Sequence, residues 1–156
     1  SEKNYDIEPE RTLAVCYRGT DKFLDTGLAS PEEFLIKIKE LNERYAGHRI
    51  LVQTDQRQFL DLCYKELTDV VHIEELPVTS TKKPMHRIVA RRDKVLWMKK
   101  LLAAIFLLSK CGFIVNHSGN VARWICLYRN HAGDTIQYLK PKNVSYDSQV
   151  ADYWLT

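Results

Sequence analysis

The sequence predicts an α/β fold of the Rossmann-like type, with a mainly parallel sheet of about five strands and helices on both faces. Short apolar segments rich in β-forming residues alternate with amphipathic segments of ten residues or more, which is typical of βαβ units. Three of the apolar segments show no polar alternation, as expected for strands covered on both faces. The predicted strands are 13–17, 49–54, 70–73, 113–116 and 135–139.

The first predicted helix is the most strongly marked element. Ser30-Pro31-Glu32-Glu33 combines an N-cap, a proline at the first helical position and a capping-box glutamate. Apolar residues then recur at spacings of three and four until Gly47. A second helix follows Asp55, which is a plausible N-cap.

Two further helices are predicted in the second half, after a long loop over 76–86 with two prolines. One runs from about Ile88 to Lys110 and ends at Gly112, which occupies the favoured C′ position. It is apolar nearly all round over 101–108, so we expect this part to be buried. The other spans 120–130. We expect the tryptophans of these helices in the core, namely Trp97 and Trp124.

The composition and the charge of the chain argue against several classes of function. The chain has 156 residues with 23 Lys+Arg and 20 Asp+Glu, and a net charge of +3 is too small to indicate nucleic acid as a partner. The longest apolar run, 101–108, falls far short of the roughly 20 residues that span a bilayer. The polar, acidic first ten residues do not resemble a secretory signal. We therefore expect a cytoplasmic protein, or a lumenal one if the chain is excised from a larger secretory-pathway enzyme.

Four cysteines stand singly in apolar segments without metal or redox spacing, which favours buried, reduced thiols. Residues 1–11 read as a lead segment, and 12–156 read as one domain. Motifs for a dinucleotide fold, a P-loop, a hydrolase elbow and a metal site are missing, so we expect no metal and no cofactor.

Candidate site residues follow the predicted strands, because ligands of such sheets bind beyond the carboxyl ends of the strands. Arg18 follows the first strand, and its planar guanidinium suits two phosphate oxygens. Gly19 beside it permits close approach. The alternative is a structural Arg18–Asp21 pair that closes a turn, and residue type leaves the two equally open. Asp21 also remains a candidate for orienting Arg18 in a binding site.

A second candidate is the turn after the fourth strand, formed by His117, Ser118, Gly119 and Asn120. A helix that begins here presents unpaired backbone N–H groups to an anion. The alternative is an ordinary N-cap. For Asp55, helix capping is the interpretation that residue type favours. His72 is expected in the core, and the basic cluster at 86–92 is expected to be a solvated face unless it meets the cleft.

Three stretches carry a resemblance to a known family. Val15-Cys16-Tyr17-Arg18-Gly19-Thr20-Asp21-Lys22 resembles the H-x-R-R-x-D segment of the GDP-fucose-dependent fucosyltransferases, especially the α-1,6-fucosyltransferase and nodulation-fucosyltransferase group. The strand that ends in Thr54-Asp55 and the turn 116–123 are similar to the segments that follow in that family. The order is the same, over about 13–130.

The resemblance implies one half of a GT-B-like fold, the nucleotide-binding half of a metal-independent glycosyltransferase. It implies that Arg18 neutralises the donor diphosphate, and that Asp55, Ser118, Gly119 and Asn120 help to hold the nucleotide. The sequence departs from the family at Cys16 and Gly19, which replace a histidine and the second arginine.

We therefore expect a GDP-fucose-like nucleotide-diphospho-sugar as donor, a glycan or glycoconjugate as acceptor, and inverting transfer at Arg18. A second, acceptor-binding domain would complete the cleft. Two alternatives remain. One is a non-catalytic nucleotide- or anion-binding module, and the other is a protein-interaction domain on the same scaffold.

Overall fold

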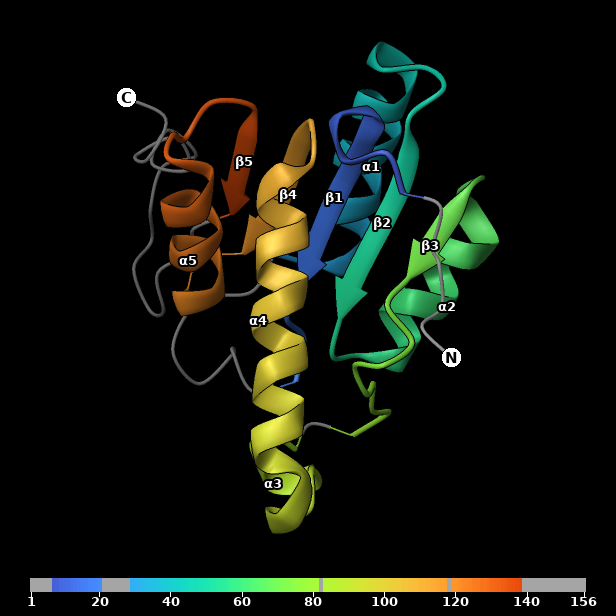
Figure 1. Ribbon diagram of the computed structural model, residues 1–156. Coiled ribbons are helices and arrows are strands. Elements are labelled where there is room, and N and C mark those ends of the chain that lie inside the picture. The colour runs from blue at the N-terminus through green and yellow to red at the C-terminus, as the bar shows by residue number, and fades with distance from the viewer. Residues whose placement is uncertain (1–6, 21–28, 82, 118, 139–156) are drawn as a thin grey trace, which may run out of the picture.

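A computed structural model describes residues 7–20, 29–81, 83–117 and 119–138. Its centre is a five-stranded sheet with the order β3-β2-β1-β4-β5, and every adjacent pair of strands is parallel (Figure 1). The α/β, Rossmann-like prediction is confirmed. The strands are β1 (Thr12–Tyr17), β2 (Arg49–Thr54), β3 (Val70–His72), β4 (Phe113–His117) and β5 (Thr135–Tyr138).

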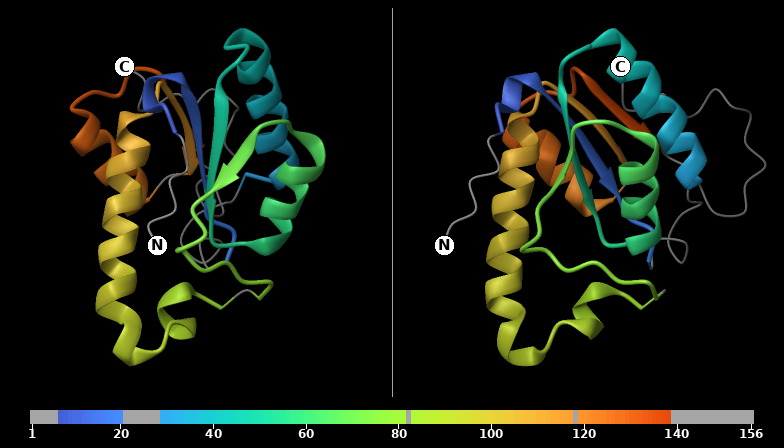
Figure 2. Two further views of the ribbon diagram at one scale, coloured as in Figure 1. Left: turned by 45° about the vertical axis from the view of Figure 1, so that its right-hand side comes forward. Right: turned by 90° about the vertical axis from the view of Figure 1, so that its right-hand side faces the viewer.

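Helices cover both faces of this sheet. α1 (Pro31–Arg44) and α2 (Arg57–Glu66) lie on one face, and α4 (Lys94–Lys110) and α5 (Asn120–Arg129) lie on the other (Figure 2). Successive side chains of a strand point to opposite faces. Leu13 and Val15 of β1 accordingly belong to the core on the α1/α2 side, and Ala14 and Cys16 to the core on the α4/α5 side.

The strand order places a topological switch point at β1. The chain passes from β1 to β2 on one side, and β4 returns to the other side of β1. In open parallel sheets this is where a crevice forms at the carboxyl ends of the strands. Arg18 and the start of α5 follow β1 and β4, so both lie at this edge.

The start of α1 confirms the predicted capping box. The backbone N–H of Glu33 donates to Ser30 Oγ at 3.2 Å, and the backbone N–H of Ser30 donates to Glu33 Oε2 at 2.6 Å. Reciprocal bonds of this kind satisfy two of the backbone donors that a helix leaves unpaired at its start.

The long helix begins later than the sequence indicates. The predicted start at Ile88 is wrong, because residues 85–88 form a separate short helix, α3 (Met85–Ile88). Val89 and Ala90 then adopt ψ angles of 126° and 145°, which are extended, before the 3-10 turn η3 (Arg91–Asp93) leads into α4. No helix among the described residues has the length and apolar character needed to cross a membrane.

Gly112 ends α4 for a reason other than the expected one. It is not among the glycines with positive φ, so a left-handed cap does not explain it. A Cβ at this position would lie 2.3 Å from the carbonyl oxygen of Glu10, and the Gly112 N–H donates to Pro9 O at 2.9 Å. The glycine therefore allows the segment before β1 to pack against this turn.

The outer surface of α4 and α5 is apolar and exposed, which corrects two predictions. Leu102 is 44% exposed and Phe106 is 51% exposed, so burial over 101–108 is only partial. Trp124 is 49% exposed and is not a core residue. Apolar residues are distributed almost evenly around α4. Because only one side of a helix can pack against a sheet, the apolar residues on the other side remain exposed.

The core position of His72 is confirmed, and it gives a pH-dependent prediction. His72 is 6% exposed, and burial, followed by the nearby charge of Arg57, lowers its pKa below 6.5, opposed by Glu74 and Glu75. Below pH 6.5, His72 is therefore protonated to a greater extent in the unfolded chain than in the folded protein. The free energy of unfolding should fall as the pH drops from 6.5 toward the lower pKa that His72 has in the folded protein.

His72→Phe removes this titration and should flatten the loss of stability between pH 7 and 5, measured by urea unfolding at each pH. The exposed His131→Phe is the control and should keep the native profile. Parallel pH profiles for native protein and His72→Phe would contradict the prediction.

Candidate functional site at the carboxyl edge of the sheet

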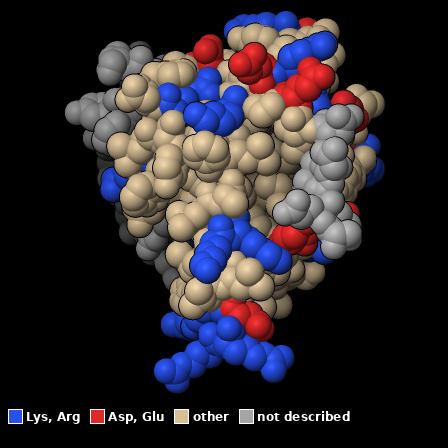
Figure 3. All heavy atoms as spheres, viewed as in Figure 1, with Lys and Arg blue, Asp and Glu red and all other residues tan. Residues whose placement is uncertain are grey.

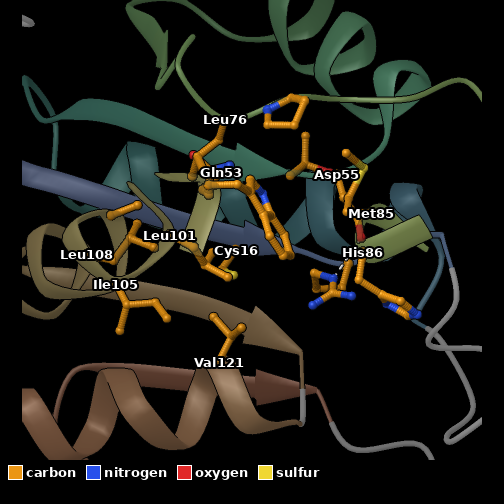
Figure 4. A pocket seen from close by; sticks show the side chains of 15 residues that line it. Cys16, Gln53, Asp55, Leu76, Met85, His86, Leu101, Ile105, Leu108 and Val121 are labelled. Carbon is orange, nitrogen blue, oxygen red and sulfur yellow. Dashed lines mark hydrogen bonds and ion pairs between the residues drawn. The ribbon is translucent and has the colours of Figure 1, made fainter. Parts of the chain in front are cut away.

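A pocket of about 180 Å³ opens at the switch point, between the carboxyl ends of β1 and β2 and the inner face of α4. Arg18 and Val121 both line it, so the tip of β1 and the first turn of α5 share one pocket. In Figure 4, Asp55, Met85 and His86 lie toward one end of the pocket, and Leu101, Ile105 and Leu108 lie toward the other.

Arg18 is held at this edge by an ion pair with Asp55. Its Nε donates to Asp55 Oδ2 at 2.7 Å, and the Arg18 side chain is 28% exposed against 7% for Asp55. The pairing fixes the plane of the guanidinium at the pocket. The described partner is thus Asp55 from the neighbouring strand. Asp21, the alternative partner, lies outside the described residues.

Asp55 does not cap α2, so the interpretation that residue type favoured is wrong. The N-cap residue is Gln56, and it makes no side-chain capping bond. The Asp55 carboxylate instead accepts bonds from the segment after β1: the Gly19 N–H donates at 3.0 Å, and the Thr20 hydroxyl donates at 2.7 Å. Together with Arg18 these donors make Asp55 the residue that organises this segment.

The packing of this segment also explains why residue 19 is a glycine. A Cβ there would lie 2.2 Å from Gln56 Oε1 and 2.8 Å from Cε1 of the Tyr17 ring. The close approach that a glycine permits is therefore used by the protein's own side chains.

The start of α5 also lies at this edge. Gly119 is its N-cap with φ 143° and ψ −178°, a conformation that disfavours other residues, and it makes no side-chain capping bond. Asn120 is the first helical residue. Ser118 lies outside the described residues.

His117 turns away from the pocket. Its ring centroid lies 4.6 Å from that of Phe34 and 4.9 Å from that of Tyr17, and the residue is 5% exposed. Both neighbours belong to the core on the α1/α2 side. The structure therefore brings together Arg18, Asp55 and the start of α5, while the imidazole of His117 packs on the opposite face of the sheet.

The pocket contains a thiol with no nucleophilic character near neutral pH. Cys16 lines the pocket, and burial raises its pKa to about 12, in spite of Arg18, whose charge acts in the opposite direction. Since the thiolate is the reactive form of cysteine, this thiol contributes a small neutral surface.

The basic cluster at 86–92 divides into two parts. All four side chains are exposed, but His86 lines the pocket and Arg87, Arg91 and Arg92 do not. Figure 3 shows Lys and Arg side chains gathered at the end of the molecule where α3 and the start of α4 lie in Figure 1. Most of the cluster is the expected solvated face, and only His86 reaches the pocket.

Gln53 and Trp97 line the pocket, although neither was predicted as a site residue. Gln53 is 8% exposed and lines the pocket near the end of β2, and Trp97 lines it from α4. For Gln53 a signal was present, because this polar residue directly follows the apolar run 50–52 of the same strand. For Trp97 the apolar helical face gave the same pattern as an ordinary core residue.

The fold and the pocket define an α/β protein with a Rossmann-like parallel sheet and a cavity at its switch point. Among the described residues, no group of three or more His, Cys, Asp or Glu side chains is arranged to hold a metal ion. Comparison with known families finds no family model that matches this chain, and comparison with curated proteins finds no match.

Proposed function

We propose that this chain binds a nucleotide-diphospho-sugar of the GDP-fucose type at the carboxyl edge of the sheet, as the donor-binding part of an inverting, metal-independent glycosyltransferase. One observation carries the proposal: Arg18, oriented by Asp55, lines the same pocket as the first turn of α5. A guanidinium and the N-terminus of a helix are both groups that bind phosphate. The resemblance of the segment 15–22 to fucosyltransferases supplies the substrate class.

In this proposal Arg18 stabilises the negative charge that grows on the diphosphate as the bond to the sugar breaks. An oriented cation is effective in this role because it needs no rearrangement when charge develops. Asp55 acts as a positioning residue, because both of its carboxylate oxygens already accept bonds from the chain. The acceptor, a glycan or glycoconjugate, would be held by a second domain across the edge.

A second candidate is a nucleotide-binding module without transferase activity. The observation that favours it is the Asp55 carboxylate 2.7 Å from Arg18 Nε, which offsets the positive charge available to a leaving group. Sugar release from GDP-fucose in the presence of a candidate acceptor domain distinguishes the two. Binding without any release supports the module.

Calorimetric titration with GDP tests the role of Arg18. We expect Arg18→Ala to weaken binding by about 1.5–3 kcal/mol, because a charge-assisted bond to phosphate is lost. Arg49→Ala is the control: Arg49 also pairs with a carboxylate through its Nε, that of Asp69 at 3.1 Å, but it stands at the opposite end of β2. Equal affinity of the native protein and Arg18→Ala for GDP would remove Arg18 from the site.

A further inference from the structure

A row of polar residues crosses the sheet beneath α4 and α5. Gln53 pairs in register with Cys16, Cys16 with Asn116, and Asn116 with Gln137, so four adjacent strands contribute one residue each at the same level. The residues two positions earlier on the first three strands are Leu51, Ala14 and Ile114, all in the core on the α4/α5 side. Because side chains alternate between faces, the row points to that side as well.

Two amides of this row carry buried polar atoms that no group among the described residues satisfies. They are Gln53 Oε1, and Oδ1 and Nδ2 of Asn116, in residues that are 8% and 0% exposed. Buried polar atoms are nearly always hydrogen-bonded, since an unpaired one destabilises the fold. An amide kept in this position is therefore suited to a partner other than the described residues, such as a bound ligand.

Gln53 is the amide residue of this row that reaches the pocket. Gln53 and Cys16 line it, whereas Asn116 lies behind Cys16 and is not among the lining residues. The remaining wall is mostly apolar, as Figure 4 shows for Leu76, Leu101 and Ile105. The volume of about 180 Å³ suits a single flat ring system, since a cavity of about 150 Å³ accommodates benzene.

We propose that this pocket holds the nucleobase of the bound nucleotide, and that the Gln53 amide forms a hydrogen bond with the edge of the base. The inference rests on the proposed function and adds the part of the ligand that the apolar pocket selects. A phosphate would lose its hydration against this mostly apolar wall. A sugar would need a partner for each of its hydroxyls. A base needs apolar contact on its faces and few hydrogen bonds at its edge.

The geometry then divides the site into two parts. The base lies between the sheet and α4, against Gln53 and the neutral thiol of Cys16. The diphosphate lies at the edge, where Arg18 and the start of α5 meet. Gln53 is thus a specificity-determining residue, distinct from the groups that bind charge.

Two nucleosides of similar shape test the role of Gln53 by calorimetric titration. Guanosine carries N–H donors on its base, and purine riboside has the same ring system without one. We expect the native protein to prefer guanosine roughly three- to tenfold, the usual range for one neutral hydrogen bond. Gln53→Met, which keeps the length of the side chain but removes the amide, should abolish this preference.

Gln137→Met is the matched control, because Gln137 stands in the same row on β5 and does not line the pocket. It should keep the native preference. Gln53→Met without ligand should melt at or above the native temperature, because it removes an unpaired buried oxygen, and this result also shows that the variant folds.

The outcomes separate this inference from the proposed function. Retention of the guanosine preference in Gln53→Met overturns the assignment of Gln53. Binding of GDP without binding of either nucleoside overturns the base pocket and leaves the role of Arg18 intact. A preference that depends on Gln53, combined with GDP affinity that does not depend on Arg18, supports the base pocket and overturns the diphosphate site. Failure of all of these ligands to bind overturns both.

Discussion

Asp55→Ala should lower the free energy of unfolding by about 3 kcal/mol, the low end of the roughly 3–5 kcal/mol lost when one partner of a buried, hydrogen-bonded ion pair is removed. The carboxylate is the acceptor for Arg18 Nε, for the Gly19 N–H and for the Thr20 hydroxyl. Thr20 is fully buried and Asp55 is 5% exposed, so water does not readily replace the lost acceptor. The segment after β1 should become less ordered as a result.

Urea unfolding of a conservative pair of variants isolates the contribution of charge. Asp55→Asn keeps the shape of the side chain and should still destabilise the fold. Asp69→Asn is the control, because the Asp69 side chain is 53% exposed in its pair with Arg49, and exposed ion pairs contribute about 0–1 kcal/mol. Asparagine also tolerates the positive φ of 52° at that position. Equal losses at the two positions would contradict a special role for Asp55.

Ile105→Ala should cost about 2–4 kcal/mol, whereas Phe106→Ala on the next residue should cost no more than about 1 kcal/mol. Ile105 is 3% exposed and packs in the core between α4 and the sheet, so its removal leaves a cavity. Phe106 is 51% exposed. Its ring centroid lies 5.8 Å from that of Tyr128 and 5.1 Å from Nζ of Lys110. Little apolar surface is lost when it is truncated.

Chemical denaturation of the two variants under the same conditions measures this difference. Both substitutions place alanine, a good helix former, in the middle of α4, so helix propensity changes little between them. A larger loss for Phe106→Ala than for Ile105→Ala would show that the outer face of α4 is buried in the folded protein.

Most of the fold could be predicted because its signals are local. The capping box at Ser30 and Glu33 lies within four residues, and the apolar composition of β1, β2 and β4 reflects burial on both faces of a parallel sheet. The limits of α4 were predicted less well. The two extended residues at 89 and 90 interrupt a pattern that remains helical in composition.

The site could be predicted only in part. The location of Arg18 and of the start of α5 at the carboxyl edge could be predicted, because position after a strand is itself informative in this architecture. The partner of Arg18 could not, because Asp55 is 37 residues away in sequence and equally suited to capping a helix. Likewise, Gln53 and Asn116 stand in strands that are not adjacent, and only the register of both with Cys16 shows that they share a row.

Local patterns in the chain thus specify that strands and helices alternate, where α1 begins and which strands are buried, because each depends on neighbours a few residues apart. The arrangement of those elements specifies the rest: that Asp55 binds the tip of β1, that His117 packs with Phe34, and that Gln53 lines the pocket. These contacts depend on strand order and on the face to which each side chain points. Both arise only when segments far apart in the chain pair within one sheet.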